Sequence, residues 1–303
     1  MASNQSSQRE AFDFKLYRYD PSLGAAIAAT AMFAVLTSVH LWLLFKAKTR
    51  YFVPFLVGGI FQTLGYAGRI WSHFDQDALG GFIMQAILIL VAPALFAASI
   101  YMILGRLIRV LHAEHLSLMP IKWITRIFVT GDVIAFTLQA AGGGTQSGGS
   151  LEMYDLGEKI IIAGLFIQII VFGFFVATSA RFHTRIVKSP TSVSADGRIA
   201  WTRHLYVLYA TSALILVRSI FRVVEYLQGN DGYLISHEVF IYVMDALLMA
   251  AVMAAFAIWY IADLQQNEGT KYSGIGLSGS MRDSSADVEI PLKAGFGAIS
   301  AGA

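Results

Sequence analysis

Residues 160–181 read IIIAGLFIQIIVFGFFVATSAR, a run of mostly apolar side chains that ends at the basic residue Arg181. About 20 apolar residues in a helix cross the hydrocarbon core of a bilayer, so the run predicts a transmembrane helix over Glu158–Ala180. Similar stretches occupy Leu23–Phe45, Val53–Trp71, Gly80–Leu104, Trp123–Ala141, His204–Arg222 and Val239–Ile261. The predicted fold class is therefore all-α, a polytopic membrane protein with a bundle of seven transmembrane helices.

Basic residues alternate between the connectors that join these stretches. The first, third and fifth connectors hold Lys46, Lys48, Arg50, Arg106, Arg109, Lys122, Arg181, Arg185, Lys188, Arg198 and Arg203. Connectors two (72–79), four (142–157) and six (223–238) hold no Lys or Arg. Because basic residues near helix ends are retained in the cytosol, we predict that the N-terminus lies outside the cell and the C-terminus lies in the cytosol.

The composition favours one membrane domain. Hydrophobic residues make up 56% of the 303 residues and charged residues 14%, with a mean hydropathy of +0.60. We expect a flexible extracellular N-terminus at 1–20, the transmembrane domain at 21–263, and a disordered cytosolic tail at 264–303. The net charge is only +2, and the basic residues lie in predicted cytosolic loops, so nucleic acid is not an expected partner. No cysteine is present, which excludes thiolate chemistry.

The last two predicted spans each carry a stripe of polar residues. The stripes consist of Arg218, Arg222 and Glu225 in one span and of Glu238, Tyr242 and Asp245 in the other, with spacings of i, i+4 and i+7. Charged side chains inside a membrane face the bundle interior and pair across helices. The two spans run antiparallel and are joined by a short connector. This puts Arg218 and Asp245 at a similar depth, roughly 10 Å below the outer surface of the membrane. We therefore expect Arg218 to pair with Asp245.

Polar residues of other spans lie at corresponding depths, between the predicted midplane and the outer face. They are Gln62, Tyr66, Arg69, Gln85, Asp132 and Gln139. One interpretation is structural, since Gln and Asp side chains can hold helices together by hydrogen bonds. The other is functional, because, with Gln168 of the fifth span included, six spans contribute polar groups to one half of the bundle. Together with the two stripes, these residues form our hypothesis for a substrate-binding cavity that opens toward the outer leaflet.

Pro93 lies inside the third predicted span. A proline there removes a backbone hydrogen bond and can bend the helix. In a bilayer, the carbonyl group that loses its partner must be satisfied by a neighbouring helix.

Four segments resemble the fungal lipid-translocating exporter family, also called RTA-like after resistance to aminocholesterol. They are FQTLGYAGR (61–69), APALFAASIYMILGR (92–106), DVIAFTLQAAGGG (132–144) and RSIFRVVEY (218–226), the last continued by Gly232, Glu238, Tyr242 and Asp245. The resemblance covers residues 20–262. The sequence departs from it at Gln62, where many members have Glu.

The resemblance implies seven spans in the fungal plasma membrane. Members are linked to release of sphingoid long-chain bases, to resistance to amphiphilic toxins and to porphyrin uptake. It therefore implies a translocator or exporter of amphiphilic lipids, with membrane lipids and an amphiphilic small molecule as partners and with no cofactor. The resemblance leaves the oligomeric state open.

Two other classes remain as alternatives. A heptahelical receptor or sensor of amphiphiles shares the predicted topology, and its ligand pocket would be coupled to the cytosolic loops. A membrane hydrolase would need clustered histidine and acidic residues. The seven histidines, at 40, 73, 112, 115, 183, 204 and 237, are scattered over both predicted faces, so we do not expect an enzyme or a metal site.

Overall fold

The computed structural model describes residues 22–75, 79–146, 151–196, 200–229, 232–234 and 236–260. The predicted flexible N-terminus (1–20) and disordered tail (264–303) lie outside these described residues. Within them the protein is helical and contains no strand. The all-α prediction is confirmed.

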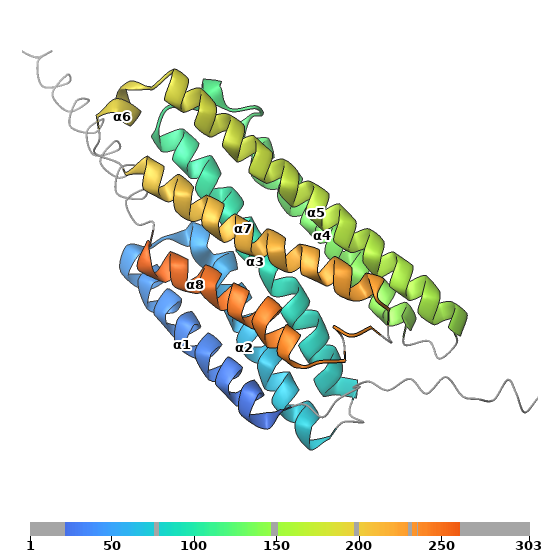
Figure 1. Ribbon diagram of the computed structural model, residues 1–303. Coiled ribbons are helices and arrows are strands. Elements are labelled where there is room, and N and C mark those ends of the chain that lie inside the picture. Colours follow the sequence, from blue (N-terminus) through green and yellow to red (C-terminus); the bar gives the residue numbers. More distant parts are fainter. Residues whose placement is uncertain are drawn as a thin grey trace, which may run out of the picture.

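Among the described residues, six long helices and one π-helical segment with its α-helical continuation account for most of the bundle. The principal elements are α1 (Leu23–Ala47), α2 (Val53–Phe74), α3 (Leu79–Val110), α4 (Ile121–Gln146), α5 (Leu151–Lys188), α7 (Trp201–Leu227), the π-helical segment η4 (Ile241–Leu247) and α8 (Leu248–Ile258). Short helical turns η2 (Arg50–Phe52), η3 (Glu114–Leu116) and α6 (Ser192–Ala195) connect them at one end. Figure 1 shows the long helices lying side by side in one bundle, with α1, α2 and α8 on one side and α4 and α5 on the other.

The central helix is α3, which packs against α2, α4 and α7. Its buried side chains include Tyr101, Ile103 and Leu107, which belong to one continuous apolar core. In a membrane protein such a core is held by close packing, because lipid tails are as apolar as the side chains that it contains. The outer faces of the other helices expose large apolar side chains, such as Phe45 on α1 and Ile170 on α5.

Six helical segments in the described part are long and apolar enough to cross a membrane. They are α1, α3, α4, α5, α7 and the continuous pair η4 and α8. The chain is therefore a polytopic helical membrane protein. Helix α2 corresponds to the remaining predicted span but is not among the six, and its polar residues Gln62, Arg69 and Ser72 are all buried.

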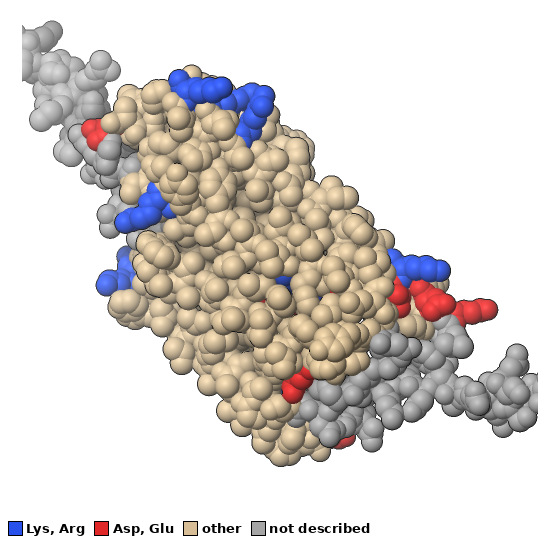
Figure 2. Space-filling view, in the orientation of Figure 1, with Lys and Arg blue, Asp and Glu red and all other residues tan. Residues whose placement is uncertain are grey.

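Charged residues gather at the two ends of the bundle. Figure 2 shows Lys and Arg mainly at the end where α6 lies, Asp and Glu mainly at the opposite end, and a broad uncharged belt between them. The last turns of α1, α3 and α5 carry Lys46, Arg109 and Arg185. Several helices are longer than predicted, since α3 extends beyond Leu104 and α5 beyond Ala180 into these basic residues.

The fourth predicted connector needs correction. We expected a connector over 142–157, but α4 continues to Gln146 and α5 already begins at Leu151. Two glycines of this predicted connector, Gly142 and Gly157, instead allow a close helix contact. A Cβ atom added at Gly142 would lie 2.6 Å from the Gly157 carbonyl oxygen, and one at Gly157 would lie 2.5 Å from the Gly142 carbonyl oxygen. Small residues permit this backbone approach between membrane helices.

Candidate functional site

A fully buried ion pair joins α7 to η4. Arg218 donates from Nε to Asp245 Oδ1 over 2.9 Å and from Nη2 to Asp245 Oδ2 over 3.3 Å, and both side chains are fully buried. The predicted pair is therefore confirmed. It forms because the two antiparallel helices bring the residues to one level, and because the planar guanidinium group matches a carboxylate in a bidentate arrangement.

Arg222 extends this pair. It lies one helical turn after Arg218, where its Nη2 donates to Asp245 Oδ2 and its Nη1 donates to Glu225 Oε2 over 2.9 Å. Asp245 therefore lies between two guanidinium groups. Such a site is costly to disturb, because removing one partner of a buried ion pair leaves a charge that water cannot reach.

Arg218 also contacts the part of α3 that Pro93 interrupts. Pro93 has no backbone N–H for the carbonyl group of Ile89, four residues earlier. Arg218 Nη2 donates to that carbonyl oxygen over 3.2 Å. The expectation that a neighbouring helix satisfies the carbonyl is confirmed, and one arginine links the irregular point of α3 to η4.

A second ion pair joins Arg69 of α2 to Glu238, just before η4, and a hydrogen bond joins Arg69 to Tyr242 on η4. Arg69 Nη2 donates to Glu238 Oε1 over 2.7 Å, and Arg69 Nε donates to the Tyr242 hydroxyl oxygen over 3.0 Å. The backbone N–H of Ser22, at the start of α1, donates to the same Glu238 oxygen over 2.8 Å. Arg69 is fully buried, and Glu238 is partly exposed.

We call these residues together the ion-pair cluster. Its members are Arg69, Arg218, Arg222, Glu225, Glu238, Tyr242 and Asp245. Three guanidinium groups face three carboxylates, so the formal charge of the cluster is zero. This balance makes its burial in an apolar bundle tolerable.

Tyr66 and Gln62 lie beside the cluster on α2. The Tyr66 ring stacks between Phe33 of α1, at a centroid distance of 5.3 Å, and Tyr242, at 6.0 Å. The Tyr66 hydroxyl and both polar atoms of the Gln62 amide are buried and have no hydrogen-bond partner among the described residues. Polar atoms buried in this way are costly unless they have partners, so this part of α2 is suited to water or to a polar head group.

The segment η4 is π-helical, and both Tyr242 and Asp245 lie on it. The sequence spacing predicted an α-helix here, and that prediction is wrong for seven residues. A π-helical segment changes the register of side chains along a helix and occurs frequently at functional sites. Here it lets Asp245 meet two arginines of α7 while Tyr242 meets Arg69 of α2.

Other predicted residues lie in a separate polar group between α3, α4 and α5. Tyr101 donates its hydroxyl proton to Asp132 Oδ2 over 2.9 Å, and Gln139 Nε2 donates to Gln168 Oε1 over 3.1 Å. Helix α4 packs against α3 and α5, whereas the ion-pair cluster involves α2, α7 and η4. The twelve predicted residues are thus divided between two regions, with Gln85 buried where α3 packs against Gly68 of α2.

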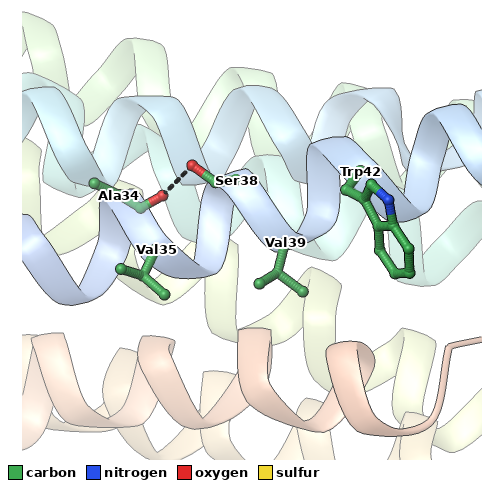
Figure 3. Close-up of a pocket in the computed structure, with 5 residues that line it drawn as sticks. All are labelled: Ala34, Val35, Ser38, Val39 and Trp42. Carbon is green, nitrogen blue, oxygen red and sulfur yellow. Dashed lines mark hydrogen bonds between the residues drawn. The ribbon is translucent and has the colours of Figure 1, made fainter.

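A surface pocket of about 450 Å³ lies elsewhere, on the outward face of α1 (Figure 3). Its lining is Ala34, Val35, Ser38, Val39 and Trp42. The Ser38 hydroxyl donates to the Ala34 carbonyl oxygen over 2.8 Å, which leaves a mainly apolar surface. Such a surface is suited to acyl chains and offers little to a polar head group.

The sequence did not predict Tyr101 as the partner of Asp132 or the Ile89 carbonyl as a partner of Arg218. A signal existed for each. Tyr101 is a hydroxyl-bearing residue inside an apolar span, and Ile89 lies four residues before Pro93, where a helix loses a hydrogen bond.

Comparison with known proteins agrees with this architecture. The family model described as RTA1 like protein matches residues 55–268. The chain is 38% identical to protoporphyrin uptake protein 1 of Saccharomyces cerevisiae, over 81% of this chain and 91% of that protein. It is 39% identical to the protein RTA1 of the same yeast, over 81% of this chain and 84% of the relative.

A more distant relative is the sphingoid long-chain base transporter RSB1 of Saccharomyces cerevisiae, 28% identical over 79% of this chain and 72% of that protein. No solved structure matches the chain. The family match covers most of the sequence and includes the residues of the ion-pair cluster. The chain belongs to the RTA1-like family of fungal membrane proteins.

Proposed function

We propose that this protein translocates amphiphilic lipids across the fungal plasma membrane, and that its substrates are sphingoid long-chain bases or related toxic amphiphiles. The observation that carries the proposal is a buried cluster of three arginines and three carboxylates in a mainly apolar bundle. Intramembrane charges mark the pathways of polar substrates in many transporters. The relative named as a sphingoid long-chain base transporter supports the substrate class.

The proposal includes seven spans with the N-terminus outside. Helix α2 would be the additional span, since it packs between α1 and α3, and its polar side chains face the interior, where they need no lipid. The basic end of the bundle would face the cytosol. The ion-pair cluster would then lie in the outer half of the membrane.

Two carboxylates of the ion-pair cluster, and others at the same end of the bundle, could bind the ammonium group of a substrate. Glu225 Oε1 and Glu238 Oε2 accept no hydrogen bond from any residue that the structure describes. Glu225 is a buried residue whose side chain is 10% exposed, and the Glu238 side chain is 17% exposed. Glu152, Asp155 and Glu158 lie on the first turns of α5 at the same end. A sphingoid base brings one ammonium group for such carboxylates and one long chain for the apolar helix surfaces.

A transfer assay tests the proposal. Liposomes with the purified protein are expected to move a labelled sphingoid base faster than an N-acylated analogue, because acylation removes the positive charge. Glu225→Gln should reduce this preference several-fold, since it removes one carboxylate charge of the cluster while Arg222 keeps its bond to Asp245. The matched control is Glu114→Gln on η3, at the basic end, which should leave the preference unchanged.

Equal transfer of both lipids would contradict the amine as the recognised group. No transfer above that of protein-free liposomes would contradict translocation altogether. In that case, saturable binding of the labelled base by the purified protein would favour the receptor or sensor.

A further inference from the structure

Asp132, on α4, is a buried carboxylate outside the ion-pair cluster. Its side chain is 5% exposed, and Tyr101 donates to its Oδ2 over 2.9 Å. Its other oxygen, Oδ1, is buried and accepts no hydrogen bond within the described residues. One oxygen is therefore held by a neutral hydroxyl group, and the other is available.

The contrast with Asp245 is large. Asp245 receives hydrogen bonds from two guanidinium groups, whereas Asp132 makes no ion pair with any residue that the structure describes. A charge in an apolar interior is tolerated when an opposite charge offsets the lost hydration. No such opposite charge contacts Asp132 among the described residues, so charge balance does not explain why an acid is present.

Apart from Tyr101, the titratable groups on α3, α4 and α5 lie at other depths of the bundle than Asp132. From α3 the facing group is Tyr101, and the Arg106 guanidinium group of the same helix lies over the Tyr51 ring. On α5 no acidic, basic, histidine or tyrosine residue occurs between 160 and 180. On α4 itself, Arg126 is six residues before Asp132, about 9 Å along the axis, and it is exposed.

Aromatic rings enclose Tyr101 on the remaining sides. Phe175 lies 4.6 Å from the Tyr101 ring centroid, Phe128 5.3 Å and Phe172 6.1 Å. All of these rings are buried. This packing leaves no described space for a lipid head group beside Asp132, but a proton needs no such space.

We propose that Asp132 is the proton-carrying group that couples lipid movement to a proton gradient. The inference rests on the proposed translocation and adds its source of energy. A proton from water forms an O–H bond at Oδ1, which gives the neutral carboxylic acid, and it is later returned to water on the other side. Tyr101 keeps its own proton throughout and orients the carboxyl group by donating to Oδ2.

An infrared measurement tests proton binding without any transport. The purified protein is expected to show the C=O stretching band of a buried carboxylic acid, and the band should be lost in Asp132→Asn. Asp132→Glu should retain it at a shifted frequency, and Tyr101→Phe should shift it by removing one hydrogen bond. A wild-type spectrum without the band, or a band unchanged in Asp132→Asn, would overturn the proposal.

Coupling is tested in the same liposomes that measure lipid transfer. An imposed pH gradient should accelerate transfer by the wild-type protein, and Asp132→Asn should lose this response while Asp132→Glu keeps it. Transfer that ignores the gradient in the wild-type protein would overturn coupling and leave translocation intact. If the wild-type protein transfers no lipid, the translocation proposal fails, and coupling fails with it.

Discussion

Replacing Asp245 with alanine is expected to destabilise the folded bundle by about 3–5 kcal/mol, the usual consequence of removing one partner from a buried ion pair. The substitution leaves Arg218, which is fully buried, without a carboxylate and leaves Arg222 with Glu225 alone. The effect should appear as a lower yield of monodisperse protein and as unfolding at a lower temperature or denaturant concentration.

The double variant Arg218→Ala/Asp245→Ala provides the decisive comparison. It should be more stable than Asp245→Ala, because the buried guanidinium group is removed together with its partner while Arg222 retains Glu225. The matched control is Thr137→Ala, on the exposed face of α4, which should change stability little. A double variant as unstable as Asp245→Ala would contradict the attribution of the loss to the unpaired Arg218 guanidinium group, and a double variant destabilised by the sum of the two single substitutions would show that the pair carries no coupling energy.

The pair of Arg218 and Asp245 was predictable from the sequence because two simple rules determine it. Helical spacing places Arg218 and Arg222 on one stripe, and a short connector brings Asp245 to the same depth from the next span. The contact of Arg222 with Asp245 was harder to predict from the sequence. Both arginines contact Asp245, which lies on the π-helical segment. A π-helix has no sequence pattern as clear as the apolar periodicity of an α-helix.

The presence of the helices was predictable from the lengths of the apolar stretches, but the residues at which the helices end were not. Basic residues such as Arg106 and Arg181 extend α3 and α5 beyond the apolar stretches, because long side chains on a continuing helix can reach the membrane surface. The predicted connector over 142–157 placed Gly142 outside the helices. In water, glycine disfavours helix, but between membrane helices its missing side chain permits close contact.

The division of the polar residues into two groups was not predictable from the sequence, because it depends on how the helices pack. Depth along each span could be read from the sequence, but the order of helices around the bundle could not. Asp132 and Arg218 both lie in the interior, yet α4 packs with α3 and α5 while α7 and η4 form the ion-pair cluster with α2. Residues at similar depth therefore belong to different polar groups, one balanced in charge and one with a carboxylate that has no counter-ion within the described part of the chain.

The contact between α4 and α5 gives the second large prediction. Gly142→Ala is expected to destabilise the protein by about 1–3 kcal/mol, because overpacking a tight contact forces the backbone to move. The new Cβ would lie 2.6 Å from the Gly157 carbonyl oxygen and 2.9 Å from the Ile161 backbone nitrogen. Neither atom can move as a flexible side chain would, so the two helices must separate.

Gly143→Ala is the matched control, since it adds the same methyl group one residue later on the same helix. No heavy atom lies within 4 Å of its added Cβ, and alanine favours helix over glycine by about 1 kcal/mol. This variant should therefore be as stable as the wild-type protein or more stable, measured by thermal unfolding of the purified protein in detergent. Gly157→Ala acts on the same contact, so its effect should combine non-additively with that of Gly142→Ala. Equal stability of the Gly142→Ala and Gly143→Ala proteins would mean that α4 and α5 do not approach through Gly142.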